Sequence, residues 1–179
     1  AHLDWNAPLE KTATEKVAAP PVEPNGTEPG LLAINAPALW AMGYTGYGQV
    51  AYTNDTGVEP DHPALAQQFR GFYVAPEVAW FEYESNNLEP YDCDDHGTHV
   101  TGTILGLDRL NNDTIGVAFN AQWVASPAIA CESGNEDNIA ALQWALDPDG
   151  DPATVDDMPD VINNSWYDPF IEDECNSVY

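Results

Sequence analysis

Basic residues are nearly absent from this sequence. Its 179 residues hold 4 lysines and arginines against 30 aspartates and glutamates, which gives a formal net charge of -26 at pH 7. A surface of that sign repels the phosphates of nucleic acids and the anionic headgroups of membranes. We therefore expect neither among the partners of this chain. Two interpretations of the charge stay open. It either solubilises the protein, or it makes the fold depend on salt ions or bound cations.

Three further features are missing: a starting methionine, a charged and then apolar leader, and an apolar run near twenty residues. These absences predict a processed, soluble chain without a membrane span, whose first residue is a cleavage product. With 44% hydrophobic residues, the chain can bury the core of one domain, or of most of one.

Residues 92–106, DCDDHGTHVTGTILG, hold two histidines beside small residues. Gly97 and Thr98 leave room for another chain segment next to the ring of His96. From His99 onward, apolar and small residues predict a buried helix, which would hold the His96 imidazole rigidly at its first turn. A histidine held in this way can take a proton from a nucleophile if a carboxylate orients it.

A suitable carboxylate follows a predicted strand upstream. Residues 49–54 have the alternating, β-rich character of a short strand, and Asp55, Thr56 and Gly57 come directly after it. An aspartate at the carboxyl end of a parallel strand, with glycine forcing the turn, points into the crevice where such sheets carry their chemistry. The alternative is structural, with Asp55 as a capping residue and His96 as the start of a helix.

The two segments, strand-D-T-G and then H-G-T-H-V-x-G, resemble the subtilisin-like serine proteases, or subtilases, whose catalytic residues follow in the order Asp, His, Ser. The resemblance implies that Asp55 orients His96, and that His96 is the general base of a serine endopeptidase. It also implies secretion and a polypeptide substrate. No cofactor is required for the chemistry, and structural Ca²⁺ is allowed because many subtilases bind it.

The remaining sequence predicts an α/β fold. We expect residues 1–29 to form an extended arm or linker, and residues 30–179 to form the amino-terminal part of a subtilisin-like catalytic domain. Strands are predicted at 69–74, 118–130 and 160–166, and a helix at 136–146. The alternation indicates a doubly wound, mostly parallel sheet with helices on both faces, present here as a partial domain.

Acidic residues also suggest metal sites. Asp147, Asp149 and Asp151 have the first spacings of a calcium loop, but Pro152 replaces the turn glycine and Met158 the bidentate glutamate, which excludes an EF-hand. A looser calcium site and a simple acidic turn both stay open, so the metal ligands are unknown at this level.

The loop before His96 is acidic as well. Its aspartates, Asp92, Asp94 and Asp95, could bind a cation, raise the basicity of His96 through space, or simply be solvated. His62, in the segment PDHPAL, is expected to fix a turn rather than to take part in chemistry.

The segment INNSW resembles the strand with which subtilases bind an extended peptide as an added antiparallel strand. By that resemblance Ser165 and Trp166 line the substrate cleft, and Trp166 walls a pocket for an apolar side chain. Tyr167 stands where the family usually has glycine, so its side chain could crowd the path of the substrate.

The sequence lacks the nucleophile of the family pattern. No serine lies in a G-T-S-M-A turn, and the segment with the oxyanion-hole asparagine is absent; the serines are Ser85, Ser126, Ser133, Ser165 and Ser177. In one explanation, the remainder of the catalytic domain supplies both groups as a second segment or chain. In the other, the chain is a non-catalytic peptide-binding or structural module. The exposed edge of a half-sheet favours the first.

The cysteines, Cys93, Cys131 and Cys175, are odd in number. In a secreted chain, one of them is then free or paired outside this segment. Cys93 precedes His96 by three residues, where a disulfide could brace the loop that carries the base. A cysteine nucleophile is the other interpretation, and the match to the serine enzymes disfavours it.

Overall fold

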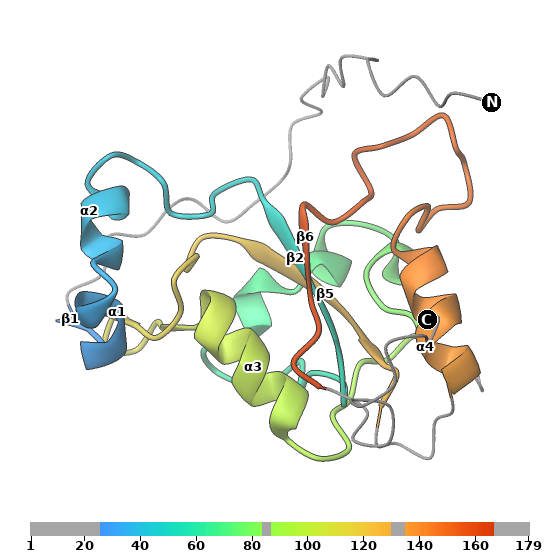
Figure 1. The fold of residues 1–179 in the computed structure, drawn as a ribbon, viewed down its shortest axis with the longest axis horizontal. Helices are drawn as coiled ribbons and strands as arrows, with labels where there is room; N and C mark the ends of the chain where they lie inside the picture. Colours follow the sequence, from blue (N-terminus) through green and yellow to red (C-terminus); the bar gives the residue numbers. More distant parts are fainter. Residues whose placement is uncertain (1–25, 84–86, 130–134, 167–179) are drawn as a thin grey trace, which may run out of the picture.

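The computed structural model describes residues 26–83, 87–129 and 135–166 (Figure 1). Its main sheet is parallel, in the order β5-β2-β6, and consists of β2 (Val50–Asp55), β5 (Gln122–Pro127) and β6 (Val161–Asn163). A small second sheet joins β1 (Gly26–Thr27), β4 (Asp113–Thr114) and β3 (Leu107–Asp108). The helices are α1 (Pro29–Ala33), α2 (Ala36–Trp40), α3 (His96–Leu105) and α4 (Asn135–Trp144), with short 3₁₀ turns η1 (Ala66–Gln68), η2 (Arg70–Phe72) and η3 (Pro76–Val78).

Strand β2 is buried along its whole length because other elements cover it on every side. Strands β5 and β6 pair with its two edges, and helices α3 and α4 both contact it. Its polar side chains have partners inside the fold. The hydroxyl of Thr53 lies 2.9 Å from that of Thr101 in α3, and the amide of Asn54 donates to Asn138 in α4 at 2.9 Å. Burial on both faces is typical of a central parallel strand.

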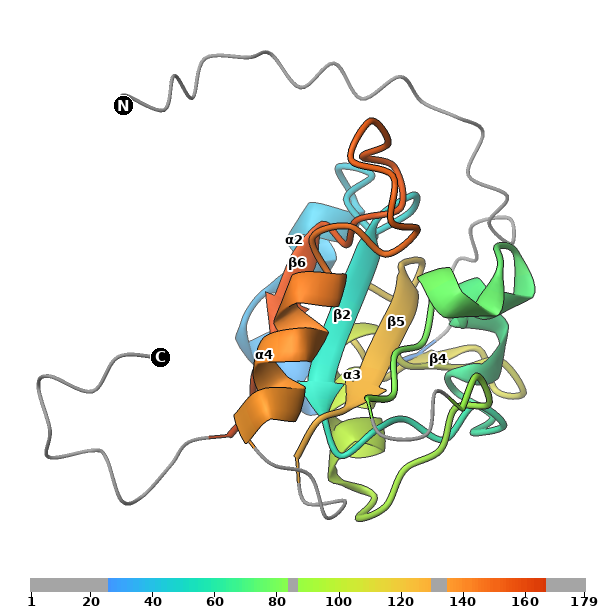
Figure 2. The same ribbon diagram turned by 90° about the vertical axis from the view of Figure 1, so that its right-hand side faces the viewer.

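The two long helices lie on opposite faces of this sheet (Figure 2). Successive residues of a strand point to opposite faces. The ring of Tyr52 packs edge-to-face on Trp144 of α4, with centroids 5.6 Å apart, whereas the next residue, Thr53, bonds to Thr101 of α3. The predicted sheet with helices on both faces is therefore confirmed. Asp55, two residues after Thr53, points toward α3.

The order of the elements decides which face of the sheet each crossover covers. Helix α3 lies between β2 and β5 in the chain, and α4 lies between β5 and β6, so the second crossover passes β2 to reach its other side. The loops after β2 and β5 therefore leave the carboxyl edge toward opposite faces. Open α/β sheets carry their functional residues at such an edge.

Most predicted elements exist with shorter bounds. The strand predicted at 118–130 is β5 at Gln122–Pro127, that at 160–166 is β6 at Val161–Asn163, and the helix predicted at 136–146 is α4 at Asn135–Trp144. Residues 1–25 of the predicted arm lie outside the described residues, and Gly26–Thr27 pair with β4.

The strand predicted at 69–74 is wrong, because this segment forms the 3₁₀ turn η2. Phe69 makes only an isolated bridge to Trp123. Its ring packs against Trp123 and Phe72, with centroids 4.4 and 5.3 Å away. Residues three apart point to opposite faces of a strand, so contact between Phe69 and Phe72 requires the tighter turn.

No helix in the described part of the chain combines the length and the apolar character needed to cross a membrane.

Helix α3 begins in close contact with the turn after β2, which leads to a prediction about its glycines. A Cβ atom at Gly97 would overlap the carbonyl oxygen of Gly57, whereas a Cβ at Gly102 meets nothing within 4 Å outside its own helix. We expect Gly97→Ala to lower the free energy of unfolding by roughly 1–3 kcal/mol. Gly102→Ala should raise it by about 0.5–1 kcal/mol, because alanine favours the helix. Urea unfolding measures both, and equal effects would contradict this packing.

Candidate active site

A buried carboxylate and a half-exposed imidazole meet at the carboxyl end of β2. Asp55 is the last residue of β2, and His96 is the first residue of α3. His96 Nδ1 lies 2.7 Å from Asp55 Oδ1, with the aspartate side chain 0% exposed and the histidine side chain 46% exposed. Because an ionised carboxylate only accepts hydrogen bonds, the ring proton belongs on Nδ1. The lone pair of Nε2 can then accept a proton from a nucleophile.

The surroundings raise the pKa of His96 above its ordinary value of 6.5. The hydrogen bond to Asp55 is the main cause; slight burial opposes it, and the negative charges of Asp55, Asp94 and Asp92 add to the increase. Of the alternatives open for the acidic loop, a through-space increase in the basicity of His96 agrees with the positions of Asp92 and Asp94. The effect suits a general base, which must hold a proton during part of the reaction.

Asp92 has a role that the sequence did not indicate. Its Oδ1 accepts a hydrogen bond from the hydroxyl of Thr56 at 2.7 Å. Its Oδ2 accepts two from Thr98, from the backbone N–H at 2.7 Å and from the hydroxyl at 2.5 Å. Thr56 also accepts a bond from the N–H of Gly97 at 2.9 Å. Together these bonds tie the turn after Asp55 to the first turn of α3.

These bonds also keep Asp92 ionised. Partial burial raises the pKa of Asp92, but the hydrogen bonds from Thr98 and Thr56 outweigh it, so that the pKa lies below its ordinary value. Asp92 is therefore not simply a solvated charge. Its hydrogen bonds connect the turn after Asp55 to the first turn of α3. The threonines of the D-T-G and H-G-T motifs were the available sequence signal, since each can donate to a nearby carboxylate.

Backbone contacts hold the loop before His96 against the same turn. Gly57 forms an isolated antiparallel bridge with Asp92, and the N–H of Cys93 donates to the carbonyl of Thr56 at 3.1 Å. Gly57 has a φ of +101°, and a Cβ there would overlap the carbonyl oxygen of Tyr91. Only glycine fits this position, which explains the last residue of the D-T-G motif.

The predicted substrate-binding residues lie on the segment after β6. The indole N–H of Trp166 donates to the carbonyl of Asn54 at 3.0 Å. This bond holds the tryptophan against the residue of β2 that precedes Asp55. Ser165 is exposed, and its hydroxyl accepts a bond from the Asn163 amide at 2.9 Å. Tyr167 lies outside the described residues.

The described serines do not bond to His96. Ser126 is buried in β5, where its hydroxyl lies 2.5 Å from that of Tyr52 and donates to Asn54 at 3.1 Å. Ser165 bonds to Asn163 as described above. The other three serines lie outside the described residues. Within the described part of the chain, the acid and base of the family pattern are thus present without a serine beside them.

The other candidate residues have separate positions. His62 fixes a turn, as predicted, since its Nδ1 accepts the N–H of Ala64 at 3.3 Å and its carbonyl accepts the N–H of Leu65 at 2.9 Å. Asp147 and Asp149 do approach one another, but their third neighbour is Asp157 rather than Asp151.

Comparisons with known proteins give several matches. The Subtilase family pattern matches residues 53–176. Bacillopeptidase F of Bacillus subtilis is 40% identical over 152 residues, which are 79% of this chain and 10% of that protein. Minor extracellular protease Vpr of the same species is 35% identical over 138 residues, 74% of this chain and 15% of that protein. Subtilisin E, also from Bacillus subtilis, is 31% identical over 120 residues, 65% of this chain and 29% of that protein.

A crystal structure of a cold-adapted subtilisin-like serine proteinase also matches, at 27% identity and a TM-score of 0.44, over 58% of this chain and 34% of that one. The chain spans 29% or less of the length of the three relatives named above. The family match covers more than half of this chain and includes Asp55 at the end of β2, the helix that begins at His96, and β6. The chain therefore belongs to the subtilase family.

Proposed function

We propose that this chain supplies the orienting aspartate and the general base of a serine endopeptidase. The observation that carries the proposal is the 2.7 Å contact between His96 Nδ1 and the buried Oδ1 of Asp55. It fixes the imidazole with Nε2 free to act and keeps a negative charge behind it. The names of three relatives, a bacillopeptidase, a protease and a subtilisin, agree with this chemistry.

In the proposed reaction, His96 moves the proton twice. Its Nε2 takes the hydroxyl proton of the serine as the serine Oγ attacks the carbonyl carbon of the peptide bond. The imidazolium then gives this proton to the leaving amine, which breaks the carbon–nitrogen bond and leaves the acyl group on the serine. His96 next takes a proton from a water molecule that attacks this ester, and returns the proton to the serine Oγ as the acid product leaves. Asp55 stays ionised and stabilises the imidazolium between these steps. The 46% exposure of the His96 side chain leaves its ring accessible to the serine and the substrate.

The remainder of the catalytic domain would supply the nucleophilic serine and the oxyanion-hole asparagine. The two outer strands of the sheet differ in a way that supports this part of the proposal. Beside β5, isolated bridges from Phe69 to Trp123 and from Trp80 to Ala125 cover the outer edge. Beside β6, Val161 and Ile162 are 58% and 42% exposed, and no described strand pairs with its outer edge. An open apolar edge favours addition of another strand, so we place the remainder next to β6.

The segment after β6 is the proposed substrate cleft. Backbone groups near Ser165 would pair with an extended peptide as an added strand. The bond from Trp166 to the Asn54 carbonyl supports this, because it holds the segment next to the residue that orients the base. Trp166 would wall a pocket for an apolar side chain of the substrate.

Secretion and a disulfide at Cys93 complete the proposal. One relative is named an extracellular protease, which supports secretion. We propose that Cys93 forms a disulfide. Because the N–H of Cys93 bonds to the Thr56 carbonyl, this disulfide would anchor the loop that leads to the base. The other cysteines, Cys131 and Cys175, lie outside the described residues.

The first prediction concerns the base itself. In the protein assembled with its serine-bearing segment, His96→Ala should lower kcat/KM for a peptide substrate by roughly four orders of magnitude or more. It should leave the thermal unfolding temperature nearly unchanged, because the side chain is half exposed. His99→Ala is the matched control, an exposed histidine of the same helix, and should retain activity. Unchanged turnover in His96→Ala would remove this residue from catalysis.

A parallel experiment tests whether a serine is present at all. Intact mass and amino-terminal sequencing of the active preparation should find a polypeptide with a G-T-S-x-A segment, and a serine-directed fluorophosphonate should label it. A lone 19.5 kDa chain that does not react would favour the alternative, a non-catalytic peptide-binding or structural module.

The second prediction concerns pH. A general base must be neutral to accept a proton, so kcat/KM should fall as the pH drops through the pKa of His96, which lies above 6.5. Asp55→Asn removes the main cause of that increase and should move the acid limb to lower pH while also lowering the plateau. Asp94→Asn should move it slightly in the same direction and keep the plateau. An acid limb that does not respond to Asp55→Asn would contradict the proposed role of the pair.

A further inference from the structure

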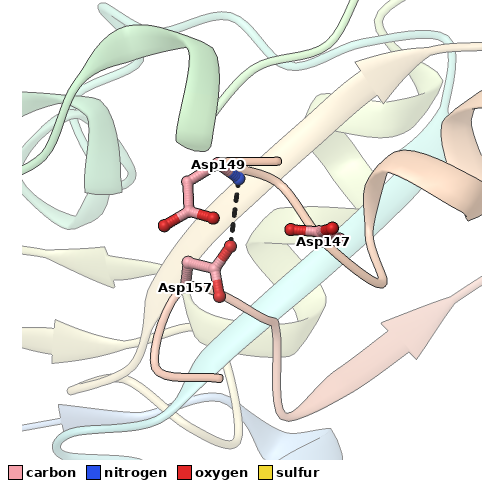
Figure 3. Close-up of side chains that lie close together, drawn as sticks. All are labelled: Asp147, Asp149 and Asp157. Carbon is pink, nitrogen blue, oxygen red and sulfur yellow. Dashed lines mark hydrogen bonds between the residues drawn. The ribbon is translucent and has the colours of Figure 1, made fainter. Parts of the chain in front are cut away.

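Three aspartates from one loop gather at a single point between α4 and β6 (Figure 3). They are Asp147, Asp149 and Asp157, and one carboxylate oxygen of each lies within 4.8 Å of the other two. In Figure 3 the side chain of Asp157 lies beside that of Asp149, with Asp147 on the adjoining part of the loop. The cluster is separate from the Asp55 and His96 pair in the chain and is not used by the proposed chemistry.

Two oxygens of this cluster are buried and have no hydrogen-bond partner among the described residues. Asp157 is only 7% exposed, and its Oδ1 is one of them. Oδ1 of Asp147 is the other. The second oxygen of Asp157 accepts the N–H of Asp149 at 3.0 Å. A buried carboxylate oxygen without a donor is costly, and a cation shared by the carboxylates of this cluster would offset that cost.

The one described arginine near Asp157 does not provide this partner. Arg70 donates to the side chain of Gln122 at 3.2 Å and to the backbone carbonyl of Asp156 at 2.9 Å. Its charge is attracted by Asp156, Asp157 and Asp160 together, so a single guanidinium faces several acids. The cluster therefore carries more negative charge than its described surroundings balance.

Asp149 is held in place by its own loop. The hydroxyl of Thr154 lies 3.0 and 2.9 Å from the two oxygens of Asp149, and the N–H of Asp151 donates to Oδ1 at 2.8 Å. Asp151 instead accepts the N–H of Ala153 at 3.0 Å. Asp151 thus has the spacing of a ligand in the sequence but takes no part in the cluster.

We propose that Asp147, Asp149 and Asp157 bind one calcium ion. Carboxylate oxygens are ligands for hard cations, and calcium binds them at about 2.4 Å in flexible geometry. Two oxygens that contact the same calcium ion lie no more than about 4.8 Å apart, and the oxygens of this cluster meet that condition. Magnesium, at about 2.1 Å, would require closer oxygens in stricter geometry. Waters and loop carbonyls would complete the shell.

The ion would stabilise the approach to β6. Asp160 follows the cluster by three residues, and its side chain and backbone both bond to the backbone of Val50 at the start of β2, each at 2.8 Å. A calcium ion at Asp157 would therefore order the connection that leads from α4 into the outer strand of the sheet.

Isothermal titration of CaCl₂ into the chelator-treated full chain tests this site. We expect one site that Asp157→Asn and Asp147→Asn each weaken at least tenfold. Asp151→Asn is the matched control: it removes the same charge from the same loop and should bind as the parent does. If the Asp157→Asn variant does not fold, the test uses Asp147→Asn, because the side chain at position 147 is half exposed. Calcium should also raise the unfolding temperature of the parent and of Asp151→Asn, but not of Asp147→Asn.

The contrary outcomes are distinct. Absence of binding in the parent, or an equal loss in Asp151→Asn, would overturn the site. Unchanged binding in both Asp147→Asn and Asp157→Asn would place calcium elsewhere and overturn it as well. MgCl₂ should bind at least tenfold more weakly, and equal affinity would overturn the assignment to calcium. None of these results depends on proteolytic activity, so the site can fail while the proposed function stands.

Discussion

The contact between the buried Asp55 carboxylate and the His96 imidazole is the constraint on which the site depends. It joins the end of the central strand to the start of a helix that lies 41 positions further along the chain. Such a contact needs a turn and a helix terminus that approach each other closely. Gly97 permits the approach, because any side chain there would meet Gly57, and Asp92 secures it by accepting bonds from both segments. The D-T-G and H-G-T motifs thus specify packing and chemistry together.

Acidic residues in this chain have at least three different physical roles. Asp55 is buried and bonded to the base, and Asp92 is half-buried and brackets two segments with its hydrogen bonds. Asp94 is exposed, and its charge raises the pKa of His96 through space. A net charge of -26 would make any further buried carboxylate expensive unless a cation accompanied it, which gives the cluster at Asp157 its significance. Net charge alone could not distinguish these roles.

The sequence predicted the pair at Asp55 and His96 and the two-sided sheet, because short motifs and alternating elements encode both. It did not predict the long-range contacts that no short motif encodes. Asp151 has the calcium-loop spacing from Asp147 and Asp149, yet the fold brings Asp157 to that point. The segment at 69–74 has strand-forming residues, yet packing of Phe69 on Phe72 and Trp123 makes it a turn. In both places tertiary contacts decide against the local pattern.

The central claim is that Asp55 holds His96 as a base with its proton on Nδ1 and its pKa raised. NMR titration of the His96 ring nitrogens measures both properties in this chain directly. The account predicts a protonated Nδ1 in the neutral ring, with its proton shifted far downfield by the bond to Asp55, and a midpoint above 6.5. A neutral ring protonated on Nε2, or a midpoint at or below 6.5, would contradict it.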